Sequence, residues 1–239
     1  MKNSDLIKKE LIDGPGYAIF SIERMDIFKN LRNSIFKKIK TKKKNNDFNS
    51  IRKLITKMSN AEINDLTVNL AKFNGLSEMI INSSPNLIKK LCGNKLFIQR
   101  RAHTVIKLPG INKPRTLPHY EMMSGISPYT YIIWAPMHDV TEEEGGIYYI
   151  NKKKSYQIMK QEHQEGIVNG PKILNMKINE KPASMKFGQA IIFNPFVMHG
   201  NNPFRSEFAR IAINVRFQSL KTPLLEKNSD YLKYYEISN

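Results

Sequence analysis

Four residues in the second half of the chain could together hold a metal ion and an anion. His119 and Glu121 are separated by one residue, and residues i and i+2 of a strand point to the same face. His199 follows an apolar segment, and its imidazole would complete a set of two histidines and one carboxylate. Such a set leaves three positions of an octahedral metal open and is typical of non-haem Fe(II) sites. Arg210 lies eleven residues further on, where a guanidinium could bind a carboxylate with two hydrogen bonds.

The order of six motifs in this half resembles the phytanoyl-CoA dioxygenase-like branch of the Fe(II)/2-oxoglutarate oxygenases. The likeness covers about residues 95 to 220. Three stretches, LFIQRR, IKLPG and SGISPYTYIIWAP, carry a closer likeness to members encoded in bacterial surface-carbohydrate gene clusters. The six motifs are His119-x-Glu121, Trp134 in YIIWAP, the acidic turn HDVTEEEGG, Gly188-Gln189-Ala190 with Phe193, His199-Gly200 and Arg210.

The resemblance implies an α+β fold, a cupin-like double-stranded β-helix or jelly roll with an N-terminal helical layer. In that fold His119, Glu121 and His199 would be the catalytic residues that hold Fe(II). The family carboxylate is usually Asp, whereas Glu121 is one methylene longer. Glu also binds iron in some enzymes of this type, so we expect the metal site to be kept.

The resemblance also implies a site for 2-oxoglutarate as co-substrate. Arg210 would bind the distal carboxylate, and Lys107 and Trp134 would be further contacts. The implied reaction is the oxidative decarboxylation of 2-oxoglutarate by O2 to succinate and CO2, coupled to oxidation of a small-molecule substrate. Hydroxylation is the expected outcome, with desaturation or another oxidation left open. The closer likeness suggests a carbohydrate or a nucleotide-linked precursor of a surface glycan as the substrate.

Two other functions stay open. Arg210 and Arg216 form an R-x5-R pattern, a spacing that is also found in AlkB-type nucleic-acid demethylases. The chain could alternatively be a β-sandwich binding protein that has lost turnover. Salt-sensitive binding of oligonucleotides would favour the demethylase, and the absence of succinate formation would favour the binding protein.

The remaining histidines have less specific surroundings. His103 is predicted to lie on one strand face with Lys107, and this face could line the pocket or be exposed. His138 and Asp139 are adjacent and would face opposite ways on a strand, so His138 is predicted to be structural. His163 lies in a polar segment that is predicted to be a solvated loop.

The composition of the chain indicates which classes of binding partner are expected. The 239 residues carry a formal charge of +17, but 29 of the 38 cations are Lys, whereas nucleic-acid recognition favours Arg. Nucleic acid is therefore an unlikely partner, and a Lys-rich solvated surface is the simpler interpretation.

No apolar run approaches the about 18 residues of a membrane span, and no secretion signal is recognised. A single cysteine, Cys92, is expected to be buried and fits the reducing cytoplasm. Nothing indicates the oligomeric state.

The site residues would be positioned by one domain over residues 1–239. Residues 1–94 are expected to be a mainly helical layer, 95–220 the double-stranded β-helix and 221–239 a C-terminal extension. Helices, from apolar residues at three- and four-residue spacing, are predicted over 27–44, 48–58, 60–73 and 85–91. Strands are predicted over 17–22, 95–108, 117–122, 129–136, 147–150, 183–186, 190–193 and 210–217. The N-terminal helices, the 109–128 loop and the 151–182 insert are expected to line the substrate pocket.

Overall fold

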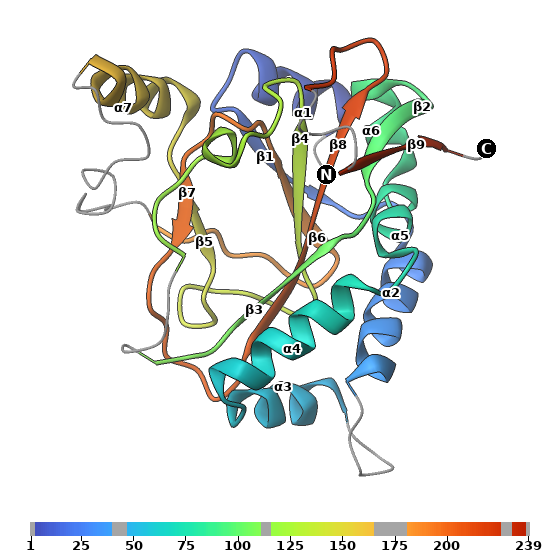
Figure 1. Cartoon of the computed structure of the whole chain (residues 1–239), viewed down its shortest axis with the longest axis vertical. Coiled ribbons are helices and arrows are strands. Elements are labelled where there is room, and N and C mark those ends of the chain that lie inside the picture. Colours follow the sequence, from blue (N-terminus) through green and yellow to red (C-terminus); the bar gives the residue numbers. More distant parts are fainter. Residues whose placement is uncertain (1–2, 40–46, 111–115, 165–180, 226–230, 238–239) are drawn as a thin grey trace.

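The computed structural model describes residues 3–39, 47–110, 116–164, 181–225 and 231–237. Within these residues the strands form two antiparallel sheets (Figure 1). The large sheet has the order β1-β6-β4-β8-β2-β9, and β3 also pairs with β8, while β5 and β7 form the small sheet. The strands are β1 Tyr17–Ser21, β2 Lys95–Gln99, β3 His103–Lys107, β4 Tyr131–Pro136, β5 Ile147–Tyr149, β6 Gln189–Phe193, β7 His199–Asn201, β8 Arg210–Ser219 and β9 Leu232–Glu236.

The helices gather mainly along one side of the large sheet, and α7 lies apart beyond the small sheet (Figure 1). Helix α4 lies beside β3 in the same view. None of the helices in the described ranges has the length and apolar character that crossing a bilayer requires. The helices are α1 Ser4–Ile12, α2 Met25–Lys38, α3 Phe48–Thr56, α4 Asn60–Ala71, α5 Leu76–Asn82, α6 Pro85–Cys92 and α7 Lys152–Gln164, with a short 3-10 helix, η1, over Glu121–Ser124.

Strand β8 is the centre of the large sheet and has apolar surroundings on both faces. Ile211, Ile213 and Val215 belong to the main core, which also contains the apolar faces of the helices. Ala212 belongs to a second cluster between the large and small sheets. Because successive side chains of a strand alternate between faces, the residues of β8 with even numbers point away from the helices. The functional side chains of β8 are found on that second face.

The local signals of the sequence account for most elements. Helix α4 begins with a capping box, in which the Ser59 hydroxyl accepts from the Glu62 N–H and the Glu62 carboxylate accepts from the Ser59 N–H. The cap is therefore Ser59 and not Asn60, where the sequence had placed the start. Cys92 is buried and unpaired as expected, and burial raises the pKa of its thiol to about 12. The predicted α+β jelly-roll class is confirmed.

Several predicted elements are wrong. The strand expected over 95–108 is two strands with a break at residues 100–102. The strand expected over 117–122 is absent, because only His119 forms a bridge, with His199, and the 3-10 helix η1 starts at Glu121. His163 lies near the end of helix α7 and not in a loop, although it is exposed as predicted. The strand expected over 183–186 is only a bridge between Met185 and Val140. Helices α1, α5 and α7 and strands β7 and β9 were not predicted.

Candidate metal centre

The two predicted histidine ligands are tied together by their own backbones. The His119 N–H donates to the His199 carbonyl over 3.0 Å, and the His199 N–H donates to the His119 carbonyl over 2.9 Å. Their rings lie side by side with centroids 4.3 Å apart. Glu121 follows at the first position of η1. The structure thus brings the ligand atoms of His119, Glu121 and His199 within 4.8 Å of one another, although the expected strand is not what aligns them.

Backbone carbonyls orient both imidazoles. Nδ1 of His119 lies 2.8 Å from the Leu117 carbonyl, and Nδ1 of His199 lies 3.0 Å from the Val197 carbonyl. Because a carbonyl only accepts, each Nδ1 carries the proton and each Nε2 keeps a lone pair. Nε2 of His199 lies 3.7 Å from Oε1 of Glu121. This arrangement, with a second hydrogen bond fixing each ring, is usual for histidines that bind metals.

The electrostatics keep Glu121 and His199 in the protonation states that a metal needs. Burial, with the neighbouring His119, lowers the pKa of His199 to about 3, so its imidazole is neutral. Burial alone would raise the pKa of Glu121, but the charge of Arg216 and its hydrogen bonds hold that pKa below its usual value. Two imidazole nitrogens and one carboxylate oxygen form a donor set that fits Fe(II).

Arg210 lies in the same cavity as the three candidate ligands and is fully buried. Its Nη1 donates to the Gly145 carbonyl, while Nε and Nη2 have no hydrogen-bond partner among the described residues. Burial lowers the pKa of Arg210 to about 10, so the guanidinium is charged at neutral pH. A buried cation with unused donors is costly unless an anion meets it. The surroundings of Arg210 therefore fit the distal carboxylate of 2-oxoglutarate.

Two aromatic side chains beside Arg210 also have unused donors. Nε1 of Trp134 and the hydroxyl of Tyr149 are buried and have no hydrogen-bond partner among the described residues. The Arg210 guanidinium carbon lies 5.4 Å from the Trp134 ring centroid, and the Tyr149 ring stacks on His199 with centroids 5.9 Å apart. Trp134 was predicted to contact the co-substrate. Tyr149 was missed, although its place on a short strand after the acidic turn could have signalled it.

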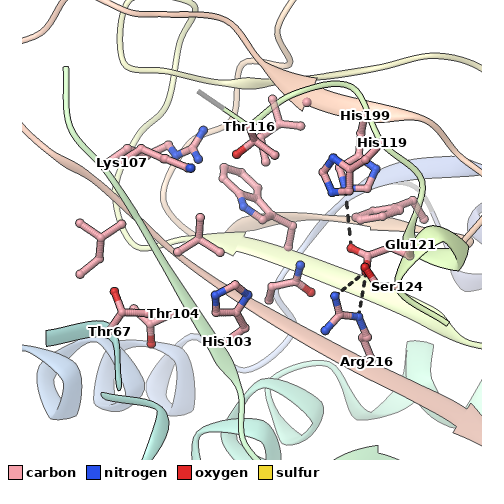
Figure 2. A pocket seen from close by; sticks show the side chains of 18 of the residues that line it. Thr67, His103, Thr104, Lys107, Thr116, His119, Glu121, Ser124, His199 and Arg216 are labelled. Carbon is pink, nitrogen blue, oxygen red and sulfur yellow. Dashed lines mark hydrogen bonds and ion pairs between the residues drawn. The ribbon is translucent and has the colours of Figure 1, made fainter. Parts of the chain in front are cut away.

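Trp134, Arg210 and the three candidate ligands border a cavity of about 470 Å³, which is within the usual size range of small-molecule sites. Lys107 and His103, both on β3, line it, which decides the two interpretations of His103 in favour of the pocket (Figure 2). Burial, with the nearby Arg210, lowers the pKa of Lys107. Further walls are formed by Ile63, Asn64 and Thr67 of α4, by Thr116 and by Ser124 of η1.

The expected pocket walls are therefore found in part. The N-terminal helices contribute α4, and the loop before η1 contributes as predicted. Helix α7, from the expected 151–182 insert, does not line this cavity, and residues 165–180 of the insert lie outside the described residues. His138 is outside the cavity, where its Nε2 accepts from the Ile211 N–H and its Nδ1–H donates to the Asp139 carbonyl. His138 thus bonds to backbone groups outside the cavity, as expected for the structural role that was predicted.

Strand β8 contributes three polar residues to the cavity, of which only Arg210 was assigned a role from the sequence. Asn214 has a buried side-chain oxygen without a hydrogen-bond partner among the described residues. Arg216 pairs with Glu121 through two hydrogen bonds. The alternation of side chains along a strand could have found both, because Arg210, Asn214 and Arg216 are separated by even numbers of residues.

Residues 26–212 match the family model described as phytanoyl-CoA dioxygenase (PhyH). None of the curated proteins matches the sequence.

Three solved structures share the fold. The first, the non-heme monooxygenase ThoJ in its apo form, is 12% identical with a TM-score of 0.62 over 98% of this chain and 85% of that chain. The second, the alpha-ketoglutarate-dependent epimerase SnoN from nogalamycin biosynthesis, is 13% identical with a TM-score of 0.54 over 90% and 83%. The third, CytC3 with Fe(II) and alpha-ketoglutarate, is 14% identical with a TM-score of 0.53 over 98% and 85%. With a family model that matches most of its length, the chain belongs to the phytanoyl-CoA dioxygenase (PhyH) family of Fe(II)/2-oxoglutarate-dependent oxygenases.

Proposed function

We propose that this protein is an Fe(II)- and 2-oxoglutarate-dependent dioxygenase that hydroxylates a small polar molecule. One observation carries the proposal. The ligand atoms of two histidines and a glutamate converge within 4.8 Å, and the same cavity contains a fully buried arginine with unused donors. A metal site alone or a buried cation alone would be weaker support for this particular function. Together they fit a metal ion and a dicarboxylate bound side by side.

Each side chain has a role in this proposal. His119, Glu121 and His199 hold Fe(II), which when bound supplies the oxidising chemistry. Arg210 binds the distal carboxylate of 2-oxoglutarate with its two free donors. Two further groups that line the cavity orient that carboxylate from other sides: the Trp134 Nε1–H, which has no hydrogen-bond partner among the described residues, and the Lys107 ammonium.

The remaining walls favour a polar substrate. Asn64, Thr67, His103 and Ser124 face the cavity with side chains that can form hydrogen bonds. A carbohydrate or a nucleotide-linked sugar is the substrate class that we would test first, because the closer sequence likeness is to enzymes of surface-carbohydrate gene clusters. Such precursors are made in the cytoplasm, which is where we place the protein.

The test is succinate formation by the purified protein supplied anaerobically with Fe(II) and 2-oxoglutarate and then exposed to O2. We expect slow turnover without substrate, and faster turnover when a substrate is added. Glu121→Ala should lose tight iron binding and succinate formation. Glu207→Ala is the matched control, because Glu207 is exposed and pairs only with Lys53 at the surface. Iron binding that is unchanged in Glu121→Ala, or no succinate from the iron-loaded protein, would contradict the proposal.

A nucleic-acid substrate can be tested separately. The R-x5-R pattern that suggested it has another use here, because Arg216 is engaged by Glu121. We expect oligonucleotides to bind weakly near physiological salt and not to stimulate succinate formation. Tight binding with a steep salt dependence, together with stimulated turnover, would favour the demethylase instead.

A further inference from the structure

Among the described residues, the Glu121 carboxylate accepts hydrogen bonds at one oxygen only. Nε of Arg216 donates to Oε2 of Glu121 over 3.0 Å, and Nη2 of Arg216 donates to the same oxygen. The other oxygen, Oε1, is the one that lies 3.7 Å from Nε2 of His199. Figure 2 shows this arrangement, with Arg216 on one side of the carboxylate and the two imidazoles on the other. The two oxygens of one carboxylate therefore face different partners.

Arg216 is itself fixed by groups from other elements. Its Nη1 donates to the hydroxyl of Tyr231, which precedes β9, and its backbone N–H donates to the side-chain oxygen of Gln99 at the end of β2. The side chain of Arg216 is 13% exposed and that of Glu121 is 3% exposed. A largely buried guanidinium whose three nitrogens each form a hydrogen bond has little freedom to move. The position of Glu121 is thus set by the large sheet and not by η1 alone.

We propose that Arg216 is a positioning residue that presents Glu121 to the metal through a single oxygen. The inference rests on the proposed role of Glu121 as an iron ligand. A carboxylate that used both oxygens would occupy a further coordination position, whereas a carboxylate bound through one oxygen leaves that position open. By holding Oε2, Arg216 also fixes the extra rotatable bond that Glu has and Asp lacks.

The sign of the effect on metal affinity separates positioning from simple electrostatics. A positive charge close to the site repels a divalent cation. If Arg216 acted only through its charge, its removal would leave metal binding unchanged or would tighten it. If Arg216 positions Glu121, its removal weakens metal binding. Residues that orient metal ligands in this way typically contribute about 10- to 100-fold in affinity.

The experiment is a titration of the full-length protein with Co(II), followed by calorimetry and by the visible absorption of the bound ion. We expect Arg216→Gln to weaken Co(II) binding about 10- to 100-fold and to change the absorption spectrum. Arg216→Lys, which keeps the charge but not the two parallel donors, should be intermediate. Tyr231→Phe should weaken binding by about fivefold or less, as expected for one neutral hydrogen bond.

Arg52→Gln is the matched control. Arg52 forms another Arg–Glu pair, with Glu144, in which the arginine is buried and the glutamate is half-buried, and Arg52 does not line the cavity. Arg52→Gln should destabilise the fold but leave Co(II) affinity and the spectrum as in the unmodified protein. If Arg216→Gln does not fold, Arg216→Lys decides the matter in its place.

The outcomes also distinguish this inference from the proposed function. Unchanged or tighter Co(II) binding in Arg216→Gln, or in Arg216→Lys if only that variant folds, would overturn the positioning role. If Glu121→Ala weakens Co(II) binding in the same series, the proposed metal site would stand while the inference about Arg216 fails. If Glu121→Ala binds Co(II) as the unmodified protein does, the proposed function fails first.

Discussion

Arg210 is a residue whose burial costs the folded protein free energy. Its guanidinium is fully buried, and two of its nitrogens have no partner among the described residues. Taking a charge out of water without pairing it is unfavourable. Such a cost persists where it serves binding, because the unused donors are then available to a ligand from the start. The unpaired charge of Arg210 thus lowers the stability of the ligand-free protein and raises its affinity for an anionic ligand.

Replacing Arg210 by Met tests both effects with two measurements on one variant. Met fills a similar volume without a charge, so the free energy of unfolding of the ligand-free protein should rise by about 1–3 kcal/mol. The affinity for 2-oxoglutarate should fall at least about thirtyfold, because a buried charge partner is lost. Chemical denaturation measures the first and calorimetry the second.

Arg101→Met provides the comparison for the arginine variant, since Arg101 is an exposed arginine near β3. It should leave the affinity for 2-oxoglutarate within about twofold and stability within about 0.5 kcal/mol. An Arg210→Met protein that still bound 2-oxoglutarate normally would show that the co-substrate carboxylate lies elsewhere.

At the scale of elements, the turn between β4 and β5 supports the co-substrate site. Its residue Gly145 has a φ of +78°, and its carbonyl accepts from Nη1 of Arg210. A Cβ at this position would lie 2.6 Å from the Phe204 ring. Glycine is therefore required here both by the backbone conformation and by the close approach of the ring.

Gly145→Ala should lower the free energy of unfolding by about 1–3 kcal/mol, since it adds strain at a positive φ and a contact that must be relieved. Because the displaced carbonyl is the one that orients Arg210, the affinity for 2-oxoglutarate should fall as well. Gly75→Ala is the matched control, because Gly75 has a φ of +92° and no atom within 4 Å of a Cβ. It should lose stability through backbone strain alone and keep its affinity for 2-oxoglutarate. Equal losses of affinity in the two variants would contradict the role of the turn.

The elements also show what the sequence can and cannot predict. The apolar runs of β4, β6 and β8 and the periodicity of α2 and α3 are local signals, so these elements were found. Helix α2 ends at Lys38, before the predicted end, and residues 40–44 of its predicted range lie outside the described residues. His119 and Glu121 were correctly paired with His199, and the Fe(II) and 2-oxoglutarate cofactors are confirmed. The strand that was expected to align His119 with Glu121 is absent, and Glu121 instead lies at the start of a 3-10 helix.

What the sequence could not predict depends on contacts between distant segments. The bonds of Arg216 join residues 95 and 15 positions away, and no local pattern marks such partners. Helix α7 was missed because its mean hydropathy is low and it buries only Ser155 and Glu162. Strand β9 was missed because it pairs along one edge only, with β2. The assignments of Lys107, Trp134 and Arg210 to the co-substrate stay predictions.

At the scale of the whole molecule, the protein combines a formal charge of +17 with buried neutral histidines. Burial, together with the charge of Arg52, lowers the pKa of His138 to about 3 from an ordinary value of 6.5. Between these two values the unfolded chain binds a proton that the folded protein does not. The folded state is therefore destabilised on acidification. Self-repulsion among the many cations acts in the same direction.

We expect the free energy of unfolding of the metal-free protein to fall as the pH is lowered from about 6.5 to 4.5. One such histidine contributes a slope of up to about 1.4 kcal/mol per pH unit. His138→Gln, which can keep both hydrogen bonds without titrating, should flatten the dependence. Added salt should raise stability at every pH by screening the cations, but it should not remove the slope. An unchanged slope in His138→Gln would mean that other groups cause it.

The position of two functional arginines on strand β8 limits where insertions and deletions can occur in the sequence. Arg210 and Arg216 are six residues apart on one strand, and β8 pairs with β2, β3 and β4. Deleting one residue between them would turn one of the two side chains to the helical face. Insertions and deletions should thus be tolerated in the loops but not within this segment. The number of residues along this one strand sets the distance between Arg210, which would bind the co-substrate, and Arg216, which would position the metal carboxylate. The residue types at these two positions can therefore change more readily than the spacing between them.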